Sequence, residues 1–190
     1  LWEAKRRKIL TTAYSIEDYP ILNLINEKHI VFICSTTGQG QVPSSMNKFW
    51  SFIMKKSLPF DILSSLLIAV IGLGDSSYAK YNFIAKKLFK RLLQLGAHPM
   101  LDLVLGDDQH DLGYCAAIDP WLEKFWPIIC DLNQMPYELI DDEQLPQKSF
   151  KYTKVNFDLV NHQSNKIVEH NYNQSNSFLS KVISNERVTP

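Results

Sequence analysis

Cysteine is scarce in this sequence of 190 residues, and its spacing excludes two classes of protein. Only Cys34, Cys115 and Cys130 are present, an odd number without the close pairs of a zinc knuckle or a disulfide framework. We therefore expect reduced thiols in a reducing compartment, each acting as a small buried apolar side chain. The five histidines are scattered. The sequence predicts no metal site.

The sequence also lacks an excess of charge and a long hydrophobic run. Its 20 basic and 20 acidic residues cancel, which argues against nucleic acid or an anionic membrane as a partner. The longest apolar run, Leu66 to Gly72, is far shorter than the ~20 residues that cross a bilayer. The chain opens on LWEAKRRKIL, as though within a helix and without a signal sequence. We expect a soluble, cytoplasmic protein.

Short apolar runs alternate with helical patterns through the first 135 residues. This alternation is typical of an α/β fold with a mainly parallel sheet. Four runs have the length and composition of strands: Ile9 to Tyr14, Ile30 to Cys34, Leu66 to Ile71, and Met100 to Leu105.

Three apolar stripes with steps of three and four residues predict the helices between these strands. Ser44 has the side chain of an N-cap for the first, and Gly96 closes the second. The third is expected to start at Asp119-Pro120 and to kink at Pro127. The stripes are Met46, Phe49, Trp50 and Ile53; Tyr81, Ile84, Leu88, Leu92 and Leu95; and Trp121, Leu122, Phe125 and Trp126.

Glycine-bearing loops follow three of the predicted strands. They are STTGQG (35–40), GLGDSSYAKYNF (72–83) and LGDDQHDLG (105–113). Ligands of open parallel sheets bind where such loops meet, at the carboxyl ends of the strands. Glycine lets the backbone approach a planar ligand closely, and Tyr78 has a ring that can lie against one. Each loop alone is a weak signal, but their order and spacing are specific.

Together with KRLLQLGA (90–97), these loops resemble the FMN-binding domain of the diflavin reductases. The branch they resemble most is the NADPH-dependent diflavin oxidoreductases of cytosolic iron–sulfur protein assembly. The similarity runs from residue 1 to about residue 135. It implies a flavodoxin-like, doubly wound parallel sheet of the α/β class. The terminal SNERVTP is similar to the start of that family's FAD-binding domain.

The resemblance also implies which residues surround the flavin of a bound FMN. Related reductases commonly have an aromatic residue where this chain has Thr37, so Tyr78 is expected to be the main partner of the ring. The peptide at Gly38 is expected to turn its carbonyl toward the flavin. The residues carried over are Ser35, Thr36, Thr37, Gly38, Gln39 and Gly40; Leu73, Gly74, Asp75, Tyr78 and Asn82; and Leu105, Gly106, Asp107 and Asp108.

Compared with the family pattern, the chain lacks the first, central strand and the phosphate loop that follows it. The run VFIC (31–34) is then expected to form an apolar sheet edge. Without the loop that holds the phosphate, we expect the chain to bind FMN far more weakly than a complete domain would. We expect an incomplete FMN-binding domain at 1–140, an asparagine-rich linker at 141–180, and the start of an FAD-binding domain at 181–190.

By this resemblance, the function is electron transfer without a protein acid, base or nucleophile. Electrons would pass from NADPH through FAD, both bound by domains outside this chain, to FMN, and then to an iron–sulfur acceptor protein similar to anamorsin. Asp107, Asp108 and Asp111 would orient that acceptor. The alternative is a truncated, non-catalytic interaction module that keeps only the partner-binding surface. Nucleotide hydrolysis is excluded because no GxxxxGK loop exists.

Overall fold

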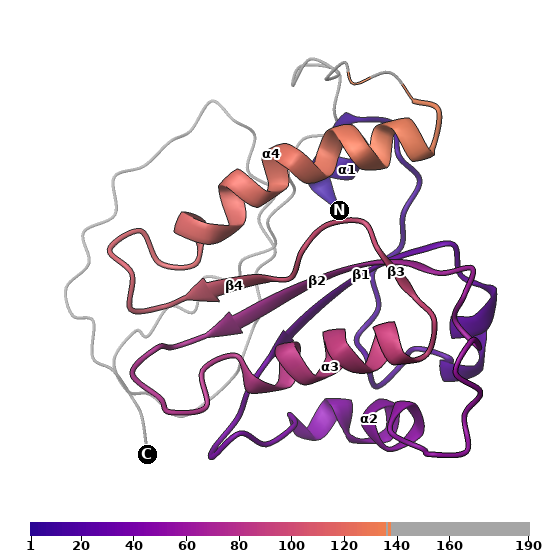
Figure 1. Ribbon diagram of the computed structural model, residues 1–190. Coiled ribbons are helices and arrows are strands. Elements are labelled where there is room, and N and C mark those ends of the chain that lie inside the picture. Colours follow the sequence, from indigo (N-terminus) through magenta and orange to yellow (C-terminus); the bar gives the residue numbers. More distant parts are fainter. Residues whose placement is uncertain (136, 138–190) are drawn as a thin grey trace, which may run out of the picture. The chain divides into compact units, whose positions relative to one another are not determined.

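The computed structural model describes residues 1–135 and 137, and these form a three-layer α/β fold. The strands lie in the middle layer, with α2 (Asn47–Ile53) and α3 (Phe83–Gln94) on one face. The helices α1 (Trp2–Arg6) and α4 (Cys115–Leu132) lie on the other face (Figure 1). The mainly parallel α/β sheet predicted from the alternating pattern is confirmed, and so is the doubly wound arrangement that the resemblance implied. The predicted segments 141–180 and 181–190 lie outside the described residues.

The sheet is organised around β2 (Leu67–Gly74), to which every other strand is hydrogen-bonded in parallel. On one side β1 (His29–Ser35) pairs with it in continuous register, from His29 opposite Leu67 to Ser35 opposite Leu73. On the other side, β3 (His98–Pro99) pairs with the start of β2 and β4 (Val104–Asp107) with its end. The strands predicted at 30–34 and 66–71 are therefore confirmed.

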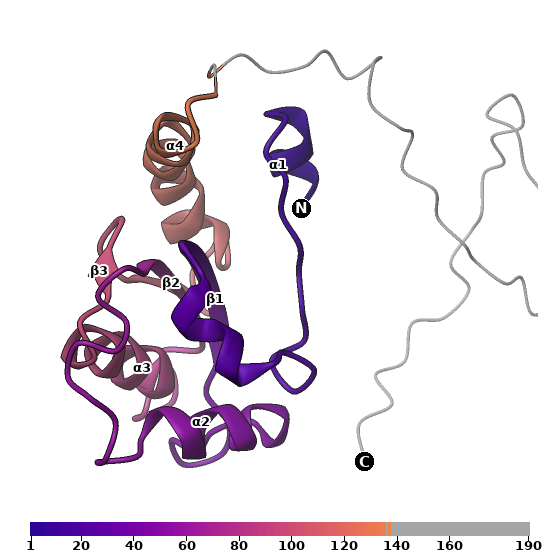
Figure 2. The ribbon, with the colours of Figure 1, turned by 90° about the vertical axis from the view of Figure 1, so that its right-hand side faces the viewer.

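The strand predicted at Ile9 to Tyr14 is wrong. Among the described residues this segment pairs with no strand, and in Figure 2 it runs as extended chain outside the sheet. Ile9 packs against the core, whereas Leu10 is completely exposed. A strand requires a ladder partner for its N–H and C=O groups, and the described chain offers none to this run.

The strand predicted at Met100 to Leu105 is displaced. Pairing stops after Pro99 and resumes at Val104. The Trp121 indole N–H of α4 donates to the Asp102 carbonyl at 2.8 Å. Because that carbonyl bonds to a helix side chain instead of a neighbouring strand, the ladder is interrupted between β3 and β4.

The outer edge of β1 is open in the described part of the chain. Phe32 and Cys34 are buried, whereas Val31 is 40% and Ile33 is 62% exposed on the opposite face. No described residue pairs with this edge. The expectation of an apolar edge at VFIC is confirmed for the described residues. Burial raises the pKa of the Cys34 thiol to about 11, so it stays protonated at neutral pH.

The layer of α2 and α3 contributes to the larger of the two core clusters. The 3-10 helices Ile21–Asn26 and Ser44–Met46 precede α2. Ser44 begins its helix without capping it, so the predicted cap is wrong. Gly96 ends α3 with φ +92°, as predicted. Arg91 joins the two helices by donating to the carbonyls of Ile53 and Lys55 at 2.8 and 2.7 Å. The core residues of this layer include Met46, Phe49, Ile53, Ile84, Leu88 and Leu92.

The helix α4 starts four residues earlier than predicted. Asp119 and Pro120 consequently lie inside it, and the helix continues through Pro127. Its buried face, Trp121, Phe125 and Ile129, packs on Ala69, Ile71 and Val104 of the sheet. Packing against β2 and β4 thus outweighs the two backbone hydrogen bonds that the prolines cannot make.

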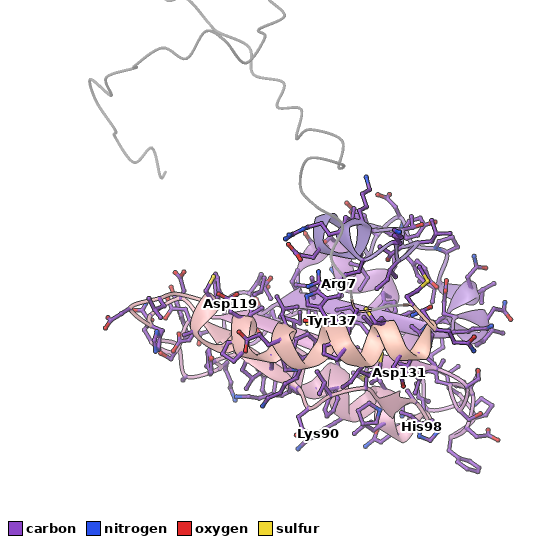
Figure 3. All side chains as sticks on the ribbon, turned by 90° about the horizontal axis from the view of Figure 1, so that it is seen from above. Arg7, Lys90, His98, Asp119, Asp131 and Tyr137 are labelled. Carbon is purple, nitrogen blue, oxygen red and sulfur yellow. The ribbon has the colours of Figure 1, made fainter. Side chains whose placement is uncertain are left out.

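The short helix α1 is attached to α4 through Arg7, which follows it. The Arg7 guanidinium lies 4.4 Å from the ring centroid of Trp126. Arg7 is buried, with only 7% of its surface exposed to solvent. It donates to the Glu3 carboxylate at 2.5 Å and to the Glu3 carbonyl at 2.9 Å. Figure 3 shows Arg7 beside α4 in the view from above.

Two further expectations concern cysteines and membranes. Cys34 and Cys130 are buried as predicted, but Cys115 is exposed because it opens α4 on the solvent side. Within the residues that the structure describes, no helix is both long and apolar enough to span a bilayer.

Candidate functional site

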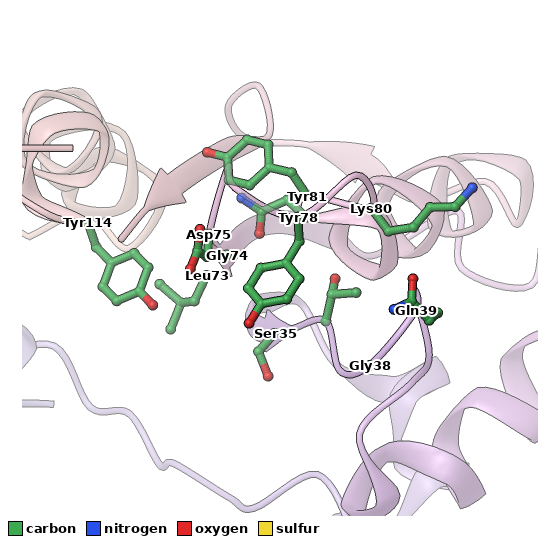
Figure 4. Close-up of a pocket in the computed structure, with 12 residues that line it drawn as sticks. Ser35, Gly38, Gln39, Leu73, Gly74, Asp75, Tyr78, Lys80, Tyr81 and Tyr114 are labelled. Atoms are coloured by element: carbon green, nitrogen blue, oxygen red, sulfur yellow. The ribbon is translucent and has the colours of Figure 1, made fainter. Parts of the chain in front are cut away.

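A cavity of about 380 Å³ lies at the carboxyl ends of β1 and β2. The parallel register places Ser35 opposite Leu73, so the turn after β1 and the loop after β2 leave the sheet side by side. Figure 4 shows the two segments facing the cavity. It is lined by Ser35, Thr36, Gly38, Gln39, Leu73, Gly74, Asp75, Tyr78, Lys80, Tyr81, Asn82 and Tyr114.

The turn after β1 is closed by its own backbone. The Thr37 N–H and hydroxyl donate to the Gln41 carbonyl at 2.9 and 3.1 Å, and the Gln41 N–H donates back to the Thr37 carbonyl at 2.8 Å. Gly38 at the tip has φ +49°, which side chains other than glycine and asparagine rarely adopt. These bonds hold the Thr37 side chain within the turn, and it does not line the cavity.

Thr36 connects this turn to the start of α3. Its hydroxyl accepts a hydrogen bond of 3.1 Å from the Ile84 N–H, one of the four N–H groups without a partner in the helix. Ser44 was expected to cap a helix with its side chain, but the side-chain bond to a helix N-terminus is made here instead, by Thr36 to α3. Thr36 and Ile84 are 48 positions apart in the sequence. Thr36 fixes the distance between the turn and the loop that precedes α3.

Asn82 forms the floor of the site. Its side chain is 1% exposed, and its φ of +51° is one that asparagine tolerates. The amide nitrogen donates to the Gly106 carbonyl at 3.0 Å. The side chain fills space left by two glycines, because a Cβ at Gly72 or Gly74 would come within 2.7 to 2.8 Å of its Oδ1 atom. That Oδ1 atom is buried without a hydrogen-bond partner among the described residues.

The third loop joins the second through Asp107. Its Oδ1 accepts hydrogen bonds from the N–H groups of Ser76 at 2.8 Å and Gln109 at 3.1 Å. The Asp108 N–H donates to the Gly74 carbonyl at 2.8 Å. Hydrogen bonding by Ser76 lowers the pKa of Asp107, and that by Ser77 lowers the pKa of Asp75. Both carboxylates are therefore ionised at neutral pH and hold the loops in place.

Tyr81 makes a second connection between the same loops. Its hydroxyl lies 3.1 Å from the Leu105 carbonyl and 3.2 Å from the Gly106 carbonyl, to which it donates. The Gly106 carbonyl therefore bonds to Tyr81 and Asn82 and has no remaining direction for a ligand.

The structure brings nine of the fifteen residues predicted for the site into one cavity. The other six do not line it: Thr37, Gly40, Leu105, Gly106, Asp107 and Asp108. The cavity also contains three residues that the sequence analysis did not select: Lys80, Tyr81 and Tyr114. Lys80 and Tyr81 lie within the glycine-bearing loop 72–83, so the motif already pointed to their segment of the chain. Tyr114 follows the third loop by one residue and carried no motif signal.

Comparison with known proteins agrees with this geometry. Residues 2–121 match the family Flavodoxin. The chain belongs to the flavodoxin family. The solved structure of a Streptococcus pneumonia TIGR4 flavodoxin has a TM-score of 0.52 at 15% identity, covering 64% of this chain and 82% of that flavodoxin. At that identity the likeness supports the fold alone.

Curated relatives of this flavodoxin-family chain are longer. A Danio rerio protein named NADPH-dependent diflavin oxidoreductase 1 is 43% identical over 198 residues, which is 98% of this chain and 32% of that protein. The Bos taurus protein of the same name is 51% identical over 137 residues, which is 72% of this chain and 23% of that protein. The chain thus spans about a third of the Danio rerio relative, and its similarity reaches beyond the residues that match the family.

The floor of the site leads to a first prediction. Replacing Asn82 by Asp keeps the shape but places a carboxylate oxygen against the Gly106 carbonyl where an N–H now donates. We expect the free energy of unfolding at pH 7 to fall by about 3 kcal/mol, as for a lost bond with an unpaired buried charge. Urea unfolding measures this. Asn133→Asp is the control, since exposed Asn133 also donates to a backbone carbonyl; an equal loss there would contradict the role of Asn82.

The carboxylates between the loops lead to a second prediction. Because the pKa of Asp107 is lower in the folded chain than the ~3.9 of an unfolded aspartate, ionised Asp107 stabilises the fold above that pH. This stabilisation is lost as the pH falls through the folded pKa. Asp107→Asn keeps the acceptor oxygen and should flatten the decline in the thermal midpoint between about pH 5 and pH 3. Identical declines in both proteins would show that Asp107 is not involved.

Proposed function

We propose that this chain is the FMN-binding, electron-transfer domain of an NADPH-dependent diflavin oxidoreductase. In this proposal electrons pass from NADPH through FAD, bound by other domains, to FMN here and then to an iron–sulfur protein of cytosolic cluster assembly. The observation that carries it is the cavity lined by the turn at 35–41 and the loop at 72–82, at the carboxyl ends of adjacent parallel strands. Similarity to the named relatives over 98% and 72% of the chain supports the same assignment.

The cavity fits the planar part of a flavin. Its volume of about 380 Å³ lies in the range of small-molecule sites. Tyr78 lines the cavity and is 61% exposed. Ser35 and Gln39 add polar side chains to the lining. A flat, hydrogen-bonding heterocycle matches these features better than a sugar or a peptide does.

The phosphate of FMN is less well matched by the same lining. Lys80 is the one basic side chain among the lining residues, and Asp75 offsets it. A phosphate dianion gains from several N–H groups or from excess positive charge, as at a helix N-terminus. This charge balance supports the expectation that the 190-residue chain alone binds FMN weakly.

The chain's own contribution is to bind and orient the ring. Backbone groups of the 35–41 turn and of Leu73 to Asp75 would lie along its edges, and Tyr78 would cover part of one face. When bound, the flavin supplies the electron-transfer chemistry, and the protein sets its surroundings. The hydrogen bonds of Thr36, Asn82 and Asp107 hold these loops at fixed separation, so little rearrangement is needed on binding.

An acceptor protein with basic groups would meet the carboxylates of the third loop, Asp107, Asp108 and Asp111. Of the three carboxylates expected to orient it, Asp107 is engaged by Ser76 and Gln109. Asp108 and Asp111 are exposed and remain available. Steering by such charges raises the association rate and weakens with salt.

A non-catalytic interaction module is the second candidate, and the open edge of β1 favours it. That edge, with exposed Val31 and Ile33, is a surface to which another strand could be added. The FMN content of the purified protein distinguishes the two functions, because a non-catalytic interaction module would not require a bound flavin.

The third prediction tests the cofactor. The complete gene product, purified under native conditions, is expected to keep one FMN per chain through gel filtration and to lose its visible absorbance on NADPH addition without oxygen. The isolated 190-residue chain should need added FMN at far higher concentration. A complete gene product without FMN would favour the interaction module.

The fourth prediction concerns the acceptor. Asp108→Asn and Asp111→Asn together should slow reduction of the iron–sulfur acceptor several-fold at low salt, with little change near 0.5 M salt, where charges are screened. Reduction of ferricyanide by the same variant should be unchanged and serves as the control. A loss that does not depend on salt would indicate a structural cause.

A further inference from the structure

Tyr114 stands at the start of α4 and reaches into the cavity from the side of the third loop. It is the residue directly before Cys115, half-buried, and it lines the cavity together with Leu73 and Asp75. In Figure 4, Leu73 and Asp75 are drawn between the rings of Tyr114 and Tyr78. Two aromatic rings from different loops therefore border one cavity.

The Tyr114 ring packs against Gly106, which has no side chain. A Cβ at Gly106 would lie 3.0 Å from Cδ1 and 3.2 Å from Cβ of Tyr114. The ring thus packs against the end of β4, and a Cβ at Gly106 would require the ring to shift by a few tenths of an ångström. The Gly106 carbonyl is held by Tyr81 and Asn82, so this part of β4 is a rigid support.

The hydroxyl of Tyr114 has no hydrogen-bond partner in the described part of the chain, residues 1–135 and 137. Burial, followed by the charges of Asp108, Asp75 and Asp107, raises its pKa, so the phenol is neutral at physiological pH. A neutral aromatic ring facing a cavity with its polar end unpaired is suited to contact with a planar ligand.

The opposite wall explains why a second ring matters. The Thr37 hydroxyl bonds to the Gln41 carbonyl within the turn, and Thr37 does not line the cavity. The turn therefore offers the cavity no ring. We propose that Tyr114 is a further contact for the flavin ring, forming a second aromatic wall beside Tyr78. This inference rests on the proposed binding of FMN, and it names a residue outside the glycine-bearing loops.

The fifth prediction tests this contact with two probes, FMN and riboflavin, titrated into the complete gene product after removal of its flavin. Tyr114→Ala should weaken the binding of both by the same factor, about fivefold, which is the size expected for one aromatic contact. Tyr114→Phe keeps the ring and should stay within about twofold of the wild type. Tyr14→Ala is the matched control, since Tyr14 is 60% exposed and does not line the cavity.

Each outcome separates the contact from other causes. A loss for FMN but not for riboflavin would mean that the effect arises at the phosphate, and it would overturn the inference. An unchanged affinity in Tyr114→Ala would overturn it while leaving the proposed function intact. A wild type that binds neither probe would overturn the proposed function and this inference with it.

Gly106→Ala provides an independent test that leaves Tyr114 in place. The added methyl group displaces the ring, so the variant should bind riboflavin less tightly than the wild type. In a Tyr114→Ala background the same change should weaken binding much less, because the ring is already absent. Equal losses in both backgrounds would show that Gly106 acts without Tyr114, contrary to the inference.

Discussion

The parallel pairing of β1 with β2 is the constraint on which the site depends. Seven residues of each strand are in continuous register, ending with Ser35 opposite Leu73. This register brings two segments that are more than thirty residues apart in the sequence to the same edge of the sheet. A shift by one residue would turn every side chain of β1 to the other face. It would bury Ile33 and expose Phe32, which packs in the core, so the hydrophobic pattern itself protects the geometry of the cavity.

Pairing alone leaves the loops free to move, and polar contacts behind the cavity restrict them. Thr36 caps α3, Asn82 reaches Gly106, and Asp107 bonds to Ser76. Each contact joins two different segments. Thr36 and Asn82 also line the cavity, whereas Asp107 supports the loops from outside its lining. In such sites the loss of a supporting contact affects binding as much as the loss of a direct one.

Sequence patterns predicted the parts of the structure that depend on local order and burial. The runs at 30–34 and 66–71 are apolar enough to be strands in any parallel sheet, and the stripe of α3 with Gly96 is a local signal. The run at 9–14 has a similar composition but no ladder partner, which local patterns do not report. The start of α4 was placed at Asp119-Pro120 from capping preferences, whereas packing on β2 and β4 extends it to Cys115. Tyr114 was missed for the same reason, because its position depends on where α4 begins.

The open edge of β1 connects the fold with the affinity of the site. Ser35 begins the turn at the cavity, and it is the last residue of a strand with one hydrogen-bonded neighbour among the described residues. An edge strand frays more readily than a strand paired on both sides, so the turn at 35–41 is supported by β2 on one side and by the bond between Thr36 and Ile84. The loop at 72–82, by contrast, follows a strand paired on both sides and is tied to the third loop. The two halves of the cavity therefore differ in rigidity, and a neighbour on the outer edge of β1 would stabilise the half that holds Gly38.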